Sequence, residues 1–454
     1  MAIKYSYIIA IIIVVIVAIA GIAYYLTTLP PTTPTPTKPA IKEVVIGLVE
    51  PLTGKHAVFG LEAKQAAELA IKHINELGGI KSLGGAKLKL VTEDSGESPE
   101  TGKLAAERLI SKEHPVIILG AYISRITAGV AEVTEREKVI LVMDALVDKL
   151  TEQGWKYVFR AAPKASQHGA SAIEFIMDMA KKKGVEVKTV VVMNEDSIFG
   201  AYVAHGAIMK AKEYGLTILD HIEYPYDIAD ATPLVSRLID LKPDVVVSVP
   251  YFHDAILIAK TVKELGFKPM FIAGAGGCGY TDPDSIKAAG AAVEYYTNTY
   301  SYNPARPTDW NKKFVNDFKA AFGKIPTEAG GIAYYSMWVI KEALEKAGEM
   351  FPEDPLNPDN LREAFLALDL TDENSPAAQT YPTGHIKFAP NGDNLYAGTA
   401  IIQVINGEPH VVWPDPEPGI EPVFPRPEWS GASALEISMN AISSIQAIES
   451  RLYN

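Results

Sequence analysis

Short runs of β-branched residues alternate with stretches rich in Ala, Glu and Lys along the chain from residue 43 onward. The first runs lie at residues 43–49, 87–94, 115–120 and 139–144. In the stretch after the first run, apolar side chains recur at helical spacing, at Ala66, Leu69, Ala70, Ile74 and Leu77. Strands that alternate with helices predict a parallel sheet covered by helices on both faces.

A second series of the same kind begins after residues 157–166. Its predicted strands lie at residues 188–194, 216–224, 243–250 and 269–274, and each is followed by a helix-like stretch. Two consecutive series of similar size predict an α/β fold with two doubly wound lobes.

The later part of the body predicts a hinge between these lobes. Helical patterns at 308–322, 327–347 and 358–369 precede hairpin-like strands in 384–413, where Asn391-Gly392 and Asn406-Gly407 are turn signals. These pieces need partners in both lobes, so the chain must cross between the lobes several times. We expect a clam shell, with a first lobe of 43–162 plus about 298–382 and a second lobe of 163–297 plus about 383–413. Ligands in such sheets lie beyond the carboxyl ends of the strands, which places the site in the cleft between the lobes.

The N-terminal segment is a predicted membrane element. Residues 5–26 are almost wholly apolar, and about 20 such residues span a bilayer as a helix. Residues 18–20, "AIA", provide a signal-peptide cleavage site as the alternative, but the run is longer than the usual apolar part of a signal peptide. We therefore expect residues 1–26 to be an uncleaved, single-pass anchor, with the bulk of the chain extracytoplasmic. The Thr/Pro-rich residues 27–42 predict an extended stalk.

The C-terminal segment, 414–454, begins as a proline-rich linker and ends in an amphipathic helical pattern. Its apolar stripe consists of Leu435, Met439, Ile442, Ile445, Ile448 and Leu452. Such a stripe most often packs on its own domain, and the alternative is self-association or contact with a membrane partner.

Composition excludes several classes of function. The net charge of −13 argues against a nucleic-acid partner, which requires clustered Lys and Arg. A single cysteine, Cys278, excludes an internal disulfide framework and a multi-cysteine metal site. The motif "GAGGCG" at 274–279 fits a dinucleotide fingerprint, but Asp282 and Pro283 predict that the next helix begins only after it. No catalytic motif was found, so we expect neither an enzyme nor a resident cofactor or metal.

Several motifs in the predicted order resemble the leucine/isoleucine/valine-binding protein family, the solute receptors of ABC importers with the type I periplasmic-binding fold. The first stretch contains "PLTG" and "FG" after the first strand, and "INELGGI" at 74–80. The similarity continues through residues 94–110, 118–142, 150–163, 196–215 and 243–267. It covers roughly residues 43–413 and implies a clam-shell receptor whose first turn, after residue 49, lines the cleft.

The resemblance also implies a set of ligand-binding residues. In the family, the serine that matches Ser124 and the helix start around it hold the carboxylate of the solute, with Thr127 following and Tyr122 preceding it. A serine at this point also normally caps its helix, and the two roles are compatible. Phe59, Phe199 and Tyr251 match the aromatic walls of the pocket.

Two positions depart from the pattern of the amino-acid receptors. The hydroxyl-rich segment that usually follows the strand at 139–143 is replaced by "MDALVDKL", with Asp144 and Ala145 at its start. The acid that usually binds the ammonium group of the ligand is replaced by Ala275. Either Asp144 supplies this charge or the ligand is not an α-amino acid. A purely structural role for Asp144, as the cap of the following helix, is the alternative.

The sequence therefore predicts a membrane-tethered solute-binding protein that delivers a small solute to an ABC permease. The expected solute is a branched-chain or other apolar amino acid, or a related carboxylate or amide. The alternative is a membrane-anchored ligand-sensing ectodomain. This alternative is disfavoured because only four residues precede the apolar run and leave no room for a cytoplasmic output domain.

Overall fold

The computed structural model of this chain describes residues 2–28 and 41–427. Residues 2–28 form a helix, α1 (Ala2–Thr28), whose described side chains are exposed. Its apolar part, Tyr5–Tyr25, has a mean hydropathy of 3.0 and is long enough to cross a bilayer. Most of the predicted stalk, residues 29–40, lies outside the described residues.

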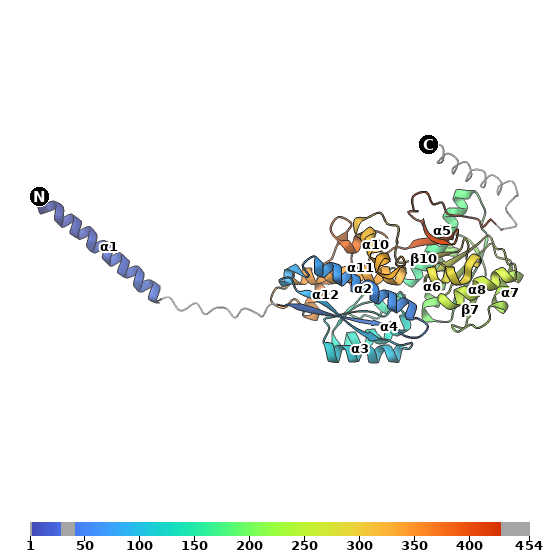
Figure 1. Cartoon of the computed structure of the whole chain (residues 1–454), viewed down its shortest axis with the longest axis horizontal. Helices are drawn as coiled ribbons and strands as arrows, with labels where there is room; N and C mark the ends of the chain where they lie inside the picture. Colours follow the sequence, from blue (N-terminus) through green and yellow to red (C-terminus); the bar gives the residue numbers. More distant parts are fainter. Residues whose placement is uncertain (1, 29–40, 428–454) are drawn as a thin grey trace, which may run out of the picture. The chain divides into compact units, whose positions relative to one another are not determined.

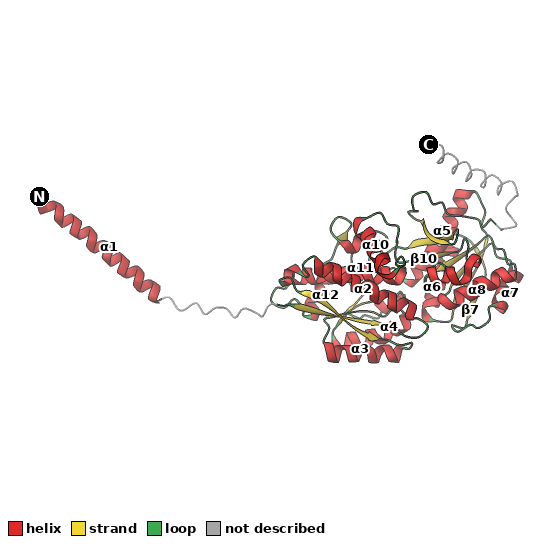
Figure 2. Ribbon diagram, viewed as in Figure 1, coloured by secondary structure: helices red, strands yellow, loops and turns green. Residues whose placement is uncertain are grey.

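The first lobe is built on a five-stranded parallel sheet in the order β2-β1-β3-β4-β5. Its strands are β1 (Glu43–Glu50), β2 (Lys87–Asp94), β3 (Ile117–Gly120), β4 (Ile140–Val142) and β5 (Val158–Phe159). In β1, every residue from 46 to 50 is buried, because helices cover both faces of this sheet (Figure 2).

The helices of the first lobe come from two distant parts of the chain. They are α2 (Ala57–Glu76), α3 (Pro99–Glu113), α4 (Ser124–Glu137), α10 (Asp309–Phe322), α11 (Glu328–Met350), α12 (Pro358–Leu366) and α13 (Pro376–Thr380). α2 packs along α11, so the blue and orange parts of the ribbon lie side by side in this lobe (Figure 1). The chain therefore returns to the first lobe with α10 to α13, as the sequence predicts.

The second lobe contains a seven-stranded sheet in the order β14-β13-β10-β9-β8-β6-β7. Its strands are β6 (Thr189–Glu195), β7 (Thr217–Tyr224), β8 (Val245–Val249), β9 (Phe271–Ala275), β10 (Thr297–Tyr300), β13 (Ala400–Ile405) and β14 (Glu408–Trp413). Its helices are α5 (Ala165–Lys183), α6 (Ile198–Glu213), α7 (Thr232–Leu241), α8 (Phe252–Glu264) and α9 (Pro283–Ala289). β6 to β10 run parallel, and β13 joins β10 antiparallel.

The chain passes between the lobes after β5, after β10 and after the short strand β12 (His385–Ile386). β10 belongs to the second sheet, so the boundary we expected near residue 298 falls inside this strand. β12 pairs with β11 (Leu370–Thr371) outside the second sheet, which the chain rejoins only at β13. These three crossings between the lobes match the multi-crossing hinge that we expected.

Two local predictions are confirmed by the backbone. Asp282 is the N-cap of α9, its Oδ1 accepts a 2.8 Å hydrogen bond from Asp284 N, and Pro283 is the first residue of this helix. The helix therefore begins after the glycine-rich loop, unlike in a dinucleotide-binding unit. Asn406 and Gly407 both have positive φ angles in the tight turn between β13 and β14.

The beginning of the C-terminal segment packs on the second lobe. Phe424 is buried, with its ring centroid 5.2 Å from that of Phe271 in β9. Gln403 accepts a hydrogen bond from Val423 N and donates one to Val423 O, both at 2.9 Å. The predicted stripe from Leu435 to Leu452 lies outside the described residues.

Candidate ligand-binding cleft

The start of α4 is open to an anion. The N-cap is Ile123, whose side chain cannot accept a hydrogen bond, and Ser124 is the first residue of the helix. The backbone N–H groups of Ser124 and Arg125 have no acceptor among the described residues. Two unpaired N–H groups at the positive end of a helix dipole attract a carboxylate.

The side chains of Ser124 and Thr127 brace this turn instead of capping the helix. Ser124 Oγ accepts a long hydrogen bond, 3.4 Å, from Val147 N. Thr127 Oγ1 donates to Ile123 O and accepts from Ala121 N, both at 3.2 Å. The capping role that serine normally has at this point is therefore absent here.

Arg125 adds a positive charge that we did not anticipate from the sequence. Its Nη2 donates to Glu97 O at 3.2 Å, whereas its buried Nε has no partner in the described part of the chain. A basic residue in the first turn of a helix opposes the helix dipole, and this is a signal that could have pointed to an anion site.

The four predicted aromatic residues lie together between the lobes. Phe59 in α2 stacks on Tyr122, with ring centroids 5.0 Å apart. From the second lobe, Phe199 in α6 and Tyr251 before α8 have centroids 5.4 Å apart. Phe59 and Tyr251 meet across the cleft at 6.3 Å. All four side chains are buried, so the structure shows the cleft closed around its aromatic wall.

Ala275, the position where the receptors of amino acids carry an acid, ends β9 and is buried. The next residue, Gly276, has a φ of +70° and lies against Phe199. A Cβ atom at Gly276 would be 2.7 Å from Cζ of Phe199, so this loop leaves no space for a longer side chain. The second-lobe wall is therefore apolar at this point.

Asp144 and Ala145 follow β4 and are fully buried. Asp144 Oδ1 accepts a 2.6 Å hydrogen bond from Tyr122 N, and no regular helix starts at this residue for it to cap. The Asp144 carboxyl lies beside that of Glu50, the last residue of β1, which has no other partner in the described chain. Burial raises the pKa of both carboxyls, and the charge of Asp144 raises that of Glu50 further.

Glu328 is a third buried acid at the base of the cleft. It lies in the first turn of α11 and accepts hydrogen bonds from Ser301 N at 2.6 Å and Tyr122 Oη at 3.1 Å. Cys278 Sγ, in the loop after β9, is 3.5 Å from the same carboxylate. Neither Glu50 nor Glu328 was predicted from the sequence, although an acid at the end of a buried strand, as at Glu50, is a usable signal.

Two acids of the second lobe flank Tyr251. Burial raises the pKa of Glu195 and of Asp254 to about 7 in each case. Glu195 accepts hydrogen bonds from Ser197 N at 2.6 Å and Ser197 Oγ at 2.7 Å, and Asp254 accepts one of 2.7 Å from Tyr224 Oη. These bonds favour the charged form of each carboxyl and oppose the effect of burial.

Hollows lined by both lobes surround the aromatic wall. One of about 260 Å³ is lined by Lys55, His56 and Phe59 of the first lobe and by Tyr226 and Tyr251 of the second, among others. A gap of about 10 Å³ separates the start of α4 from Phe199, Tyr226 and Tyr251. Outside this gap, a groove of about 450 Å³ has Ser124 in its wall. The start of α4 thus faces a nearly closed space between the lobes.

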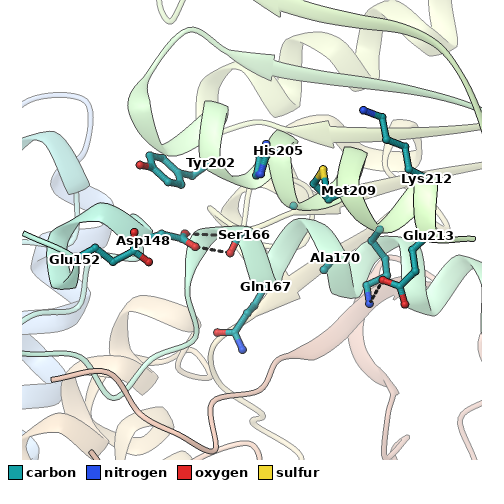
Figure 3. A pocket seen from close by; sticks show the side chains of 12 residues that line it. Asp148, Glu152, Ser166, Gln167, Ala170, Tyr202, His205, Met209, Lys212 and Glu213 are labelled. Carbon is teal, nitrogen blue, oxygen red and sulfur yellow. Dashed lines mark hydrogen bonds and ion pairs between the residues drawn. The ribbon is translucent and has the colours of Figure 1, made fainter. Parts of the chain in front are cut away.

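A wider groove of about 740 Å³ lies elsewhere on the surface (Figure 3). It is lined by α5, α6 and the turn at 148–152, with Tyr202, His205 and Met209 along one wall. Asp148 accepts hydrogen bonds from Ser166 N at 3.1 Å and Ser166 Oγ at 2.5 Å. This groove contains none of the predicted ligand-binding residues, so its size does not make it the site.

Comparisons with known proteins agree with this geometry. Residues 43–408 match the sequence model of a family described as "Periplasmic binding protein". The chain is 30% identical over 387 residues to Leu/Ile/Val-binding protein homolog 8 of Brucella abortus (strain 2308), covering 83% of this chain and 92% of the relative.

Solved structures show the same two-lobed arrangement. A leucine binding protein, LivK, from Thermotoga maritima MSB8 has a TM-score of 0.69 and 25% identity, covering 81% of this chain and 97% of that one. A solute binding protein of an ABC transporter from Rhodopseudomonas palustris BisB5, in complex with 3,4-dihydroxy benzoic acid, has a TM-score of 0.68 and 24% identity. The match covers 81% of this chain and 95% of that one.

Proposed function

Because the chain belongs to the periplasmic binding protein family, it is a solute receptor of an ABC transporter and not an enzyme, and we propose that it captures a small carboxylate with an apolar body. Branched-chain and other apolar amino acids are the first candidates, followed by related carboxylates and amides. The name of the Brucella relative and the leucine binding protein of Thermotoga support the first class. The complex with 3,4-dihydroxy benzoic acid supports an aromatic carboxylate on the same fold.

The observation that carries this proposal is the uncapped start of α4. The donors available to a carboxylate are the free N–H groups of Ser124 and Arg125, together with the unpaired Nε of Arg125. We call these three groups the donor set. The donor set faces Phe199 and Tyr251 across a narrow gap. A carboxylate bound by the first lobe would place its apolar body against the aromatic side chains of the second.

Binding and closure then form one equilibrium. In our proposal, the lobes open about the crossings after β5, β10 and β12, and a solute that touches both lobes shifts the population toward the closed form. The closed form presents both lobes in one orientation, which the permease would recognise. No group of three or more His, Cys, Asp or Glu side chains arranged for a metal occurs in the described residues, and the mechanism uses none.

Replacement of Ser124 by proline tests the backbone donors directly. Proline is tolerated at the first position of a helix, and Ile123 already has the extended conformation (φ −74°, ψ 111°) that precedes proline. Ser124→Ala removes only the hydroxyl, whereas Ser124→Pro also removes the N–H. Loss of a hydrogen bond to a charged group, about 1.5–3 kcal/mol, predicts roughly ten- to a hundredfold weaker binding for Ser124→Pro than for Ser124→Ala.

Asp309→Pro is the matched control for this experiment. Asp309 is the first residue of α10, and Thr308 before it is also extended (φ −75°, ψ 154°). The control should leave affinity unchanged, which calorimetry will measure. Equal affinities of Ser124→Pro and Ser124→Ala would refute a carboxylate at the start of α4.

We also propose that α1 is retained as a membrane anchor. The length and hydropathy of Tyr5–Tyr25 are those of a membrane span, but a signal sequence near an N-terminus has the same properties. N-terminal sequencing of the mature protein decides between them. A sequence that begins near Gly21 would show cleavage and a released receptor.

A further inference from the structure

The loop between β7 and α7 crosses the mouth of the cleft. Its residues Tyr226 and Asp227 belong to the second lobe, but their side chains contact the first. Within the second lobe, Asp196 Oδ1 accepts a 2.9 Å hydrogen bond from Tyr226 N and fixes the loop. The loop between β7 and α7 is therefore anchored to the second lobe, while its side chains contact the first lobe.

The ring of Tyr226 lies close to two cations of the first lobe. Lys55 Nζ is 4.1 Å from the centroid of its ring, and the guanidinium carbon of Arg125 is 4.7 Å from it. Both distances are within the range of cation–π attraction. Lys55 also forms an ion pair with Asp227, so one lysine contacts both residues of the loop.

The hydroxyl of Tyr226 forms a hydrogen bond with Nε2 of His56. On the other side of the imidazole, Nδ1 of His56 is 2.5 Å from Oε2 of Glu97. The backbone N–H of His56 also donates to Oε1 of Glu97 at 3.1 Å. Because a carboxylate only accepts, it fixes the hydrogen of the imidazole on Nδ1 and leaves Nε2 as the acceptor for Tyr226. Glu97 of the first lobe thus orients His56 of the same lobe so that its Nε2 accepts the hydrogen bond from the Tyr226 hydroxyl.

Tyr226 also divides the space inside the cleft. It lines the 260 Å³ hollow on one side and the 10 Å³ gap at the start of α4 on the other. Its ring centroid is 5.8 Å from that of Tyr251, which lines both spaces as well. A solute that reaches Ser124 from the hollow must pass this side chain.

We propose that Tyr226 and Asp227 form an interlobe latch, which holds the cleft closed without a ligand and which a solute must displace to pass from the 260 Å³ hollow to the start of α4. The latch rests on the proposed function in one respect, since it sets the affinity and exchange rate of that same site. Tyr226 and Asp227 are positioning residues in this scheme, because they act through the closure of the lobes.

The distance between the lobes tests the latch without any ligand. Spin labels on Lys112→Cys in α3 and Lys263→Cys in α8 report on opening in the full chain in detergent, with Cys278→Ser in every protein, because opening of the cleft would expose this thiol beside Glu328. We expect Asp227→Asn to raise the ratio of open to closed molecules about two- to fivefold, as for a partly exposed ion pair. Tyr226→Phe should raise it about fivefold and Tyr226→Ala further, because the alanine also removes both cation–π contacts.

Matched substitutions within the second lobe serve as controls. Tyr214→Phe alters an exposed tyrosine, and Asp220→Asn breaks an ion pair with Arg237 of the same lobe. Both should leave the distance distribution of the wild type unchanged. The latch is wrong if Asp227→Asn and Tyr226→Ala give the same distribution as these controls.

A kinetic measurement with L-leucine and benzoate links the latch to binding. Variants without the latch should bind either probe with a faster association rate, because access is no longer gated, and release it faster still. Unchanged association rates in variants that do open would overturn the gating role of Tyr226. If neither probe binds any of the proteins, the proposed ligand class fails, while the distance measurement still decides the latch.

Discussion

The backbone N–H of Tyr122 donates a 2.6 Å hydrogen bond to Asp144 Oδ1, and this bond joins the turn before α4 to the turn after β4. Asp144 thereby supports the segment that carries the proposed carboxylate site. Its second oxygen, Oδ2, is buried, and the carboxyl lies beside that of Glu50. The acid that the sequence suggested as a countercharge is therefore bonded to the turn that we propose binds the carboxylate.

Asp144→Asn tests whether this acid recognises an ammonium group. The asparagine Oδ1 can still accept from Tyr122 N, so the substitution removes charge and keeps the support. If the solute is an α-amino acid, we expect a loss of roughly 1.5–3 kcal/mol, or ten- to a hundredfold in affinity, measured by calorimetry. Unchanged affinity for the amino acid would exclude the countercharge and point to a ligand without a positive charge. Glu328→Gln provides the same test for the acid below Tyr122.

Glu50→Gln should change how stability depends on pH. Burial and the neighbouring Asp144 raise the pKa of Glu50 well above 4.5, so the folded chain holds this proton at a higher pH than the unfolded chain. The stability that this proton contributes is present in acid and lost as the pH rises through the raised pKa. The variant should therefore gain stability relative to the wild type as the pH rises from 5 to 8.

Denaturant unfolding across this pH range is the measurement. Glu43→Gln is the matched control, because Glu43 is the exposed residue at the other end of β1 and pairs with Lys89. The stability of the Glu43→Gln control should depend on pH in the same way as that of the wild type. Parallel pH profiles for Glu50→Gln and the wild type would show that the acid pair carries no linked proton.

Acidification should weaken ligand binding through His56. Burial lowers the pKa of His56 below 6.5 against the opposing charge of Glu97, and Arg125 and Lys55 lower it further. The closed form therefore prefers the neutral imidazole, and its stability falls as the pH drops below 6.5 and the open form takes up a proton. From the second lobe, Tyr226, Asp227 and Tyr251 also face this histidine, the Tyr251 ring with its centroid 5.7 Å from that of His56.

The pH dependence of the dissociation constant, compared between the wild type and His56→Gln, isolates this effect. Glu195 and Asp254, with pKa values of about 7, also titrate in this range, but they do so in both proteins. We expect the wild type to lose severalfold more affinity than the variant between pH 7.5 and pH 5.5, by the population shift of a single proton. Identical pH profiles would remove His56 from the closing mechanism.

The sequence predicted the features that depend on local pattern. Most strands and helices of both lobes, the cap at Asp282 and the turn at Asn406-Gly407 depend on neighbouring residues and were predicted, whereas the strand β10 was not. The start of α4 was predicted less well, because Ile123 and not Ser124 is the N-cap. A shift of one residue in a helix boundary is beyond what a sequence pattern resolves, yet it decides which N–H groups are free.

The remaining site residues come together only in the folded chain. His56 and Tyr226 are 170 residues apart in the sequence, and Tyr122 and Glu328 are 206 apart. Each of these side chains alone suggests a surface or core residue. Their roles depend on the crossings that bring α11 and the loop after β7 to the cleft, and such non-local contacts leave no periodic signal.

A thermal-shift panel on the wild-type protein tests the central claim most directly. The panel contains apolar amino acids, small aliphatic and aromatic carboxylates, their amides, and sugars as the contrasting class. A solute that binds the native form at 100 times its dissociation constant adds about 2.7 kcal/mol to the free energy of unfolding. We predict that at least one apolar amino acid or carboxylate raises the melting temperature and that the sugars do not. A rise with sugars and none with amino acids, carboxylates or amides would contradict a carboxylate bound at the start of α4.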